Sequence, residues 1–199
     1  MTAEERTPNV DLGFAHHWQA QVLAARPTIL PRRRFVYPRD AEEVERGALE
    51  VLVRLAASGA EPFLATCALG FRDPAAPTGI WSCPNAEELC AVAGGYAYII
   101  DTNAPERFTM LPFRPVLEVR SLPEQGLLLF VGHHAILAWG SDGQAWQSEK
   151  LSDEGVTITQ IENTALRGMG WSMRTDKETP FEIDLRTGST SVLPPTAAQ

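Results

Sequence analysis

The sequence is poor in cysteine and has neither a long apolar run nor an excess of positive charge. Three cysteines among 199 residues cannot all pair with one another, so reduced thiols are expected in place of a disulfide framework. No apolar run approaches the ~18 residues that cross a bilayer. The acidic start MTAEER is followed by no apolar stretch, which argues against a secretory signal. These absences predict a soluble, cytoplasmic protein with no membrane partner.

The charge balance excludes one class of partner. Asp and Glu number 25 against 17 Lys and Arg, so the formal net charge is −8. An acidic chain repels phosphate backbones, and no nucleic-acid partner is expected. The exception is residues 1–40, where six arginines outnumber four acidic residues. Arg32, Arg33 and Arg34 form the one basic cluster, which we interpret as a solvated patch, with an anion or an acidic partner as the alternative.

Motifs of catalysis and cofactor binding are also missing. The chain contains no Gly-x-Ser-x-Gly elbow, no HExxH, no phosphate-binding GxxxxGK[ST] and no GxGxxG. Cys83 and Cys90 are too far apart for the usual zinc spacing, and Cys67 lies in an apolar string that is typical of a core position. The sequence therefore predicts no cofactor and no bound metal, and it favours a non-enzymatic protein.

What the sequence does contain is many short elements. Fifteen glycines and fifteen prolines favour short strands over long helices. Near the start, residues 13–26 predict a short helix that presents Phe14, Trp18 and Val22 on one face and stops at Pro27. A helical turn is expected over 41–46. Residues 49–55 predict a strand that forms a hairpin with 62–70, although a helix would also fit their pattern.

From residue 78 onward the pattern is that of strands bounded by Gly, Pro, Asn or Asp. No stretch there combines helical length with helical period, so the fold class is all-β for about two thirds of the chain. The predicted strands are 34–37, 79–83, 89–93, 96–101, 116–120, 127–131, 135–139, 156–161, 165–169 and 181–185.

An internal repeat accompanies these strands. Residues 89–101 align without a gap to residues 127–139, which places Gly94 on Gly132, and Gly170 follows at the same spacing of 38. An apolar strand precedes each glycine. We therefore expect meanders of three or four antiparallel strands that cover one another's apolar faces.

These meanders resemble, in a general way, the blade repeats of β-propellers over residues 79–188. The Trp-Asp dipeptide of one propeller class is absent, and no named family of known function is identified. A closed propeller typically needs at least four blades, whereas three are apparent, with 49–70 as a candidate for a fourth. The resemblance implies an all-β fold of antiparallel meanders in blade-like repeats, arranged as a partial propeller, a sandwich or a flattened barrel.

The expected organisation has three parts. Residues 1–38 would form an N-terminal tail, a short helix and a connector. Residues 39–193 would form a single all-β domain with blade-like repeats, and residues 194–199 a C-terminal tail.

The turns of the repeat supply the predicted site. If the units stack in register, the turns at 94–95, 132–134 and 170–171 gather on one rim, which in propellers is the usual binding face. The candidate binding residues are Gly95, Tyr96, His133, His134 and Trp171, with the two aromatic rings as stacking surfaces. The simpler interpretation is that His133 and His134 are polar turn residues.

The leading functional hypothesis is a non-enzymatic protein-interaction module that presents this rim to a protein partner or to a second copy of the chain. The alternative is a small-molecule-binding protein or a hydrolase-like enzyme with His133 or His134 as general base. A third hypothesis places a divalent metal at the two histidines with a nearby carboxylate.

Overall fold

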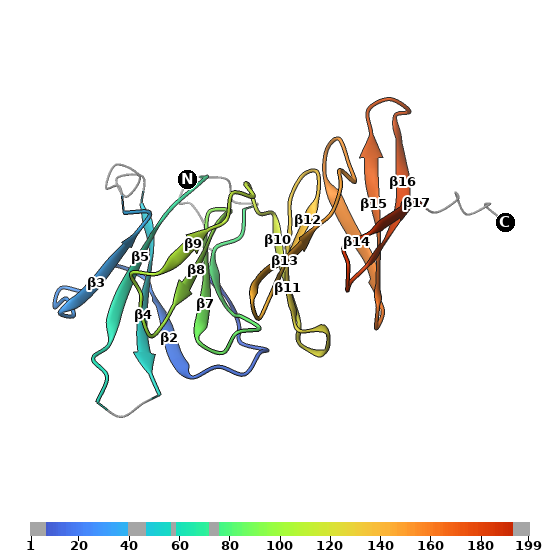
Figure 1. Ribbon diagram of the computed structural model, residues 1–199. Helices are drawn as coiled ribbons and strands as arrows, with labels where there is room; N and C mark the ends of the chain where they lie inside the picture. Colours follow the sequence, from blue (N-terminus) through green and yellow to red (C-terminus); the bar gives the residue numbers. More distant parts are fainter. Residues whose placement is uncertain (1–6, 40–46, 57–58, 72–75, 193–199) are drawn as a thin grey trace. The chain divides into compact units, whose positions relative to one another are not determined.

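The computed structural model describes residues 7–39, 47–56, 59–71 and 76–192, and these residues form strands joined by short turns (Figure 1). No α-helix is present in these ranges, and none of their elements is a helix long and apolar enough to cross a membrane. The chain separates into two compact units, Met1–Val116 and Leu117–Gln199. The predicted limits at 1–38, 39–193 and 194–199 remain predictions.

The first unit consists of two sheets. One has the strand order β2-β4-β5-β3, in which β3 runs parallel to β5 and the other pairs are antiparallel. Its strands are β2 (Trp18–Leu23), β3 (Arg33–Tyr37), β4 (Ala48–Leu55) and β5 (Phe63–Ala68). The other sheet has the order β1-β6-β7-β8-β9, an antiparallel meander to which β1 adds in parallel beside β6. Its strands are β1 (Asn9–Asp11), β6 (Gly79–Ser82), β7 (Glu88–Ala93), β8 (Tyr96–Asp101) and β9 (Phe108–Met110).

These two sheets bury one face each in a shared core. Val51, Val53 and Phe63 from the first sheet belong to the same cluster as Leu89 and Ile100 from the second, and all five are fully buried. Burying each such side chain contributes about 1.5–3 kcal/mol relative to leaving it in water. Face-to-face packing of sheets therefore holds this unit together.

The second unit is built from two meanders of consecutive strands. The first is β10 (Glu118–Leu122), β11 (Leu127–Val131), β12 (Ile136–Gly140) and β13 (Gly143–Gln147), with a single 3₁₀ turn, η2 (Pro123–Gln125), before β11. The second is β14 (Val156–Ile161), β15 (Ala165–Ser172), β16 (Lys177–Asp184) and β17 (Thr190–Val192). Leu129, Val131, Leu166 and Ile183 share the core between them. The indole N–H of Trp146 also donates to the carbonyl of residue 185, at 2.7 Å.

The predicted fold class is confirmed. The chain is all-β, and its meanders have the four antiparallel strands of a blade-like unit, as the resemblance to propeller blades implied. The predicted strands 96–101, 127–131 and 156–161 coincide with β8, β11 and β14. The predicted hairpin of 49–55 with 62–70 is the antiparallel pair β4 and β5.

The predicted helix over 13–26 is wrong, because this segment contains strand β2. Trp18 is buried, Ala20 and Val22 are half-buried, and Gln19 and Gln21 between them are exposed, which is the alternation of a strand with one face on the core. Pairing with β4 overrides the helical spacing of Trp18 and Val22. The helical turn expected over 41–46 lies outside the described residues.

Of the three evenly spaced glycines, two lie in hairpin connections and the third does not. Gly94 lies in the β7–β8 hairpin with φ of +56°, and Gly132 lies in the β11–β12 connection. Gly170, in contrast, is inside β15 and pairs with Thr179. A Cβ at this position would meet the Leu151 carbonyl oxygen at 2.1 Å. Gly170 therefore permits a close backbone approach, and the expected turn at 170–171 is wrong.

All three cysteines are buried and unpaired. Cys67, as expected, is a core residue between the sheets of the first unit. Burial raises the pKa of the thiols of Cys67, Cys83 and Cys90 above their usual values. They therefore remain protonated and poorly nucleophilic at neutral pH.

Replacing Gly170 with alanine tests the close approach inside β15. We expect Gly170→Ala to destabilise the protein by about 1–3 kcal/mol, because the added methyl meets backbone that cannot rotate away. Gly140→Ala is the matched control, since a Cβ there lies 3.6 Å from the nearest atom. It should change the free energy of unfolding by less than about 0.5 kcal/mol. Urea titrations of both variants measure the difference, and equal stabilities would contradict the assigned role.

Candidate functional site

The two histidines of the predicted rim lie in the β11–β12 connection, where the Gly132 N–H donates to the Ala135 carbonyl at 3.0 Å. Both side chains are exposed, and their ring centroids are 6.0 Å apart. Nδ1 of His134 lies 3.1 Å from the Ser152 carbonyl oxygen, which it can reach only as a donor. The predicted turn is thus present, and His134 is part of its hydrogen bonding.

Trp171, near the end of β15, is connected to the histidine turn through Ser152. The Ser152 hydroxyl donates to the Trp171 carbonyl at 3.1 Å and accepts from the Trp171 N–H at 2.9 Å. The backbone N–H of Ser152 and of Leu151 both point at the His134 carbonyl, at 3.4 and 2.7 Å. His134 and Trp171 therefore both hydrogen-bond to the short segment of Leu151 and Ser152.

This arrangement does not pair a nucleophile with a base. His134 contacts the carbonyl of Ser152, whereas the Ser152 hydroxyl is occupied by the backbone of Trp171. The neighbouring Asp153 carboxylate contacts Nζ of Lys150 at 2.6 Å and the Met173 N–H at 2.7 Å. These hydrogen bonds, the one from Lys150 foremost, hold the pKa of Asp153 below its usual range. The described part of the chain contains no group of three or more His, Cys, Asp or Glu side chains placed to hold a metal ion.

The remaining predicted residues, Gly95 and Tyr96, belong to the first unit. Gly95 has φ of +78° in the β7–β8 turn, and a Cβ there would lie 2.9 Å from the Val116 carbonyl oxygen. The Tyr96 ring packs edge-on against Phe71 at 5.5 Å, and the Arg114 guanidinium lies 4.9 Å from its centroid. These contacts give Gly95 and Tyr96 structural roles. A common rim of all five predicted residues remains a prediction.

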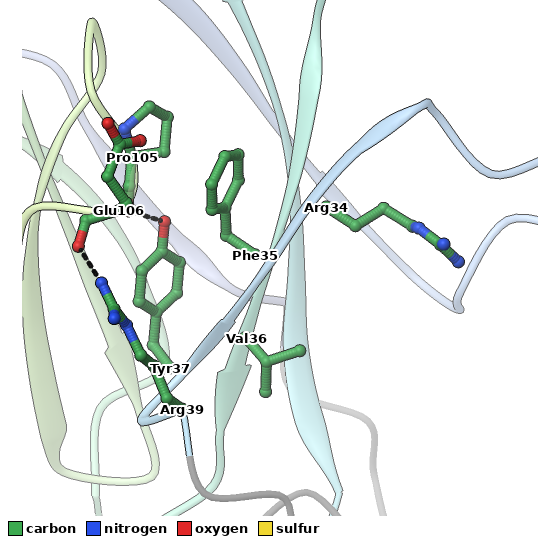
Figure 2. A pocket seen from close by; sticks show the side chains of 7 residues that line it. All are labelled: Arg34, Phe35, Val36, Tyr37, Arg39, Pro105 and Glu106. Carbon is green, nitrogen blue, oxygen red and sulfur yellow. Dashed lines mark hydrogen bonds between the residues drawn. The ribbon is translucent and has the colours of Figure 1, made fainter.

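A second candidate site, which the sequence analysis did not identify, is a hollow of about 330 Å³ along strand β3 (Figure 2). Phe35 and Tyr37 lie on the side of the strand that faces Pro105, whereas Arg34 points away from it. The full lining is Arg34, Phe35, Val36, Tyr37, Arg39, Pro105 and Glu106. Four consecutive strand residues form one wall, so the hollow follows the strand.

Tyr37 fixes the opposite wall of this hollow. Its side chain is 1% exposed, and its hydroxyl donates to the Pro105 carbonyl at 2.7 Å. Its ring also packs edge-on against Phe108, with centroids 4.9 Å apart. Burial raises the pKa of the Tyr37 hydroxyl, which therefore stays a donor throughout the neutral range. Arg39 adds a second link by donating to the Glu106 carbonyl at 2.7 Å.

Strand β3 is the last strand of its sheet. In a parallel ladder every second residue directs its N–H and C=O groups toward one neighbour, so the alternate residues of β3 point away from β5. No backbone group of residues 33–37 bonds to a described residue on that open side. The hollow thus borders an edge whose outward donors and acceptors have no backbone partner among the described residues.

The edge carries the basic cluster of the sequence. Arg34 is exposed and has no ion pair within the described ranges. Arg32 is 3.8 Å from the Glu61 carboxylate, with both side chains largely exposed, so this pair is weak. The Arg33 guanidinium lies 5.7 Å from the centroids of both Phe35 and Phe63, which holds it in place. The cluster is therefore partly oriented, and among the described residues only the weak Arg32–Glu61 pair offsets its charge.

A neighbouring hollow of about 530 Å³ shares Arg39 and Glu106 with the first and extends along the edge strand β9. Its lining is Arg39, Glu88, Ile99, Asp101, Glu106, Arg107, Phe108 and Thr109. Here three acidic residues accompany two arginines, so the basic character is confined to the β3 side.

One feature of the sequence pointed toward this site, the arginine cluster beside a predicted strand. It could not indicate the opposite wall, because Pro105 and Glu106 lie about 70 positions further along the chain and reach β3 only through the packing of two sheets.

No protein-family model and no curated protein matches the chain. Among solved structures it is similar to the N-terminal domain of Nup159, at 11% identity and a TM-score of 0.38, covering 94% of this chain and 53% of that one. It is also similar to a chain in the S. cerevisiae complex of Dbp5 bound to Nup159, Gle1, IP6 and ADP. That match has 9% identity and a TM-score of 0.38, and it covers 93% of this chain and 51% of that one. The chain thus spans about half the length of the chains it matches.

Single alanine variants separate the roles of the two histidines. We expect His134→Ala to lower the free energy of unfolding by about 1 kcal/mol, because it loses the hydrogen bond to the Ser152 carbonyl. His133→Ala, at an exposed position of the same turn, should leave stability unchanged and is the control. Chemical denaturation measures both. Equal effects would remove the structural role assigned to His134.

Asp153 predicts a pH-dependent contribution to stability. Because its pKa is lowered in the folded state, the ionised carboxylate stabilises the fold above the ordinary Asp pKa of about 4, and this contribution is lost as the pH falls through the lowered value. The difference in denaturation midpoint between the wild type and Asp153→Asn should therefore be largest at neutral pH and shrink in acid. Asp142→Asn, in the exposed β12–β13 turn, is the control. A difference in denaturation midpoint between the wild type and Asp153→Asn that persists in acid would contradict this assignment.

Proposed function

We propose that the protein is a non-enzymatic protein-interaction module that receives a segment of a protein partner at the hollow along β3. The observation that carries this proposal is the coincidence of a strand edge that pairs with no other described strand and a hollow lined by four consecutive residues of that strand. An exposed strand edge can bind another chain through main-chain hydrogen bonds. Proteins usually protect such edges against unwanted pairing.

The chemistry of the hollow supports binding in preference to catalysis. Its polar groups are Arg34, Arg39 and Glu106, while the Tyr37 hydroxyl is already bonded to a carbonyl. These groups supply charge and hydrogen bonds, but they do not form a nucleophile with an activating base. The function that this surface supports is therefore recognition of a chain in the cytosol, where the three unpaired thiols are stable.

The rim predicted from the repeat enters the proposal as a second contact surface. His133, exposed beside His134, and the half-exposed Trp171 are the residues through which the second unit would contact a partner. Met173, which is 71% exposed, lies in the turn that follows Trp171 and adds apolar area there.

Site-specific photo-crosslinking tests the proposed site. The photoreactive residue p-benzoylphenylalanine in place of Val36, within the hollow, should give a discrete adduct with a partner protein or a second copy in an extract of the source cells. The same residue in place of Arg174, in the exposed β15–β16 turn, should not give this adduct. A strictly monomeric protein that forms no adduct from position 36 would overturn the proposal.

A further inference from the structure

We propose that the occupant of the β3 hollow is an extended acidic peptide segment that adds to the sheet as a new strand beside β3. This inference rests on the proposed function and specifies the chemistry of the partner. It combines two independent observations: β3 pairs with no described strand on its outer side, and Arg34 has no ion pair within the described ranges.

The shape of the hollow favours an extended chain. One wall is the strand from Arg34 to Tyr37, and the other is the Pro105–Glu106 turn, which Tyr37 and Arg39 hold in place. A volume of about 330 Å³ is at the small end of the range of ligand sites. A strand laid along β3 would fill such a space and satisfy the backbone groups that point away from β5.

The charges select an acidic sequence. An added strand places its side chains about 4.5–5.5 Å from those directly opposite on β3, so a carboxylate beside Arg34 would meet a cation that no described residue neutralises. Arg39 lines the same hollow toward its other end and donates to the Glu106 backbone carbonyl, and Glu106 is the one acidic residue of the lining. The chain as a whole carries a net charge of −8, so the arginines along β3 are a local basic site on an otherwise acidic chain and attract an acidic segment.

The order of side chains in the segment follows from the alternation of β3. Arg34 and Val36 lie on one side of the strand, and Phe35 and Tyr37 lie on the other. An occupant with acidic residues at alternate positions and apolar residues between them would match both sides, because successive side chains of a strand point to opposite faces.

The test uses the full chain and a fluorescein-labelled ten-residue peptide of alternating Glu and Val. A control peptide carries Gln in place of every Glu. We expect the acidic peptide to bind at least about tenfold more tightly in fluorescence anisotropy, with an affinity that weakens as salt is added. Equal affinities for the two peptides would overturn the acidic assignment.

A charge reversal locates the binding. Arg34→Glu should weaken binding of the acidic peptide by about five- to tenfold, whereas Arg174→Glu, which makes the same change in net charge on an exposed turn, should have little effect. Both positions are exposed, so both variants should melt like the wild type. Equal loss in the two variants would show only a general effect of net charge and would overturn the site.

Hydrogen exchange tests strand addition itself. On binding the acidic peptide, amides within residues 33–37 that point to the open edge should exchange at least about tenfold more slowly. Unchanged exchange there, or equal displacement of the peptide by a thymidine oligonucleotide, would overturn strand addition in favour of simple anion binding. A crosslink at position 36 together with failure of the peptide tests would refute only the acidic strand, whereas a strictly monomeric protein that forms no crosslink would refute the protein-binding role.

Discussion

Each unit of this chain depends on two sheets that bury apolar faces against each other. In the first unit this packing joins β4 and β5 to β7 and β8, and in the second it joins β11 and β12 to β15 and β16. Packing covers faces, so the outer edge of an end strand such as β3 has no partner strand among the described residues. The β3 hollow is a direct result, since Tyr37 contributes to the core with its ring and fixes the opposite wall with its hydroxyl. Core and candidate site are thus connected through one side chain.

The sequence was sufficient for the fold class because alternation and turn residues are local signals. Strands such as β8 and β11, with apolar residues between Gly-rich turns, could be placed to the residue. Strand β2 could not, because Trp18 and Val22 satisfy both a helical and an extended pattern, and only pairing with β4 decides between them. Short strands such as β1, β9 and β17, of three residues each, have no periodicity to detect.

The candidate sites show the same limit. The turn that holds His133 and His134 could be predicted, but its link to Trp171 runs through Ser152, a residue without any distinctive pattern. The spacing of the repeat predicts a turn at Gly170, whereas the role of this residue is to admit the carbonyl of Leu151. Equal spacing along the chain therefore identified equivalent strands more reliably than equivalent turns. Contacts between distant segments, like that of β3 with Pro105, have no local signature.

The burial of all three thiols has a practical consequence for spectroscopy. Because Cys67, Cys83 and Cys90 are inaccessible and their pKa values are raised, thiol-directed dyes and spin labels will not modify the folded chain. A single cysteine engineered on the surface would then be the sole reactive group, and the native cysteines could stay in place. Cys67, which lies in the core between the sheets of the first unit, becomes reactive when these sheets separate, so its rate of labelling in the wild type reports on their opening.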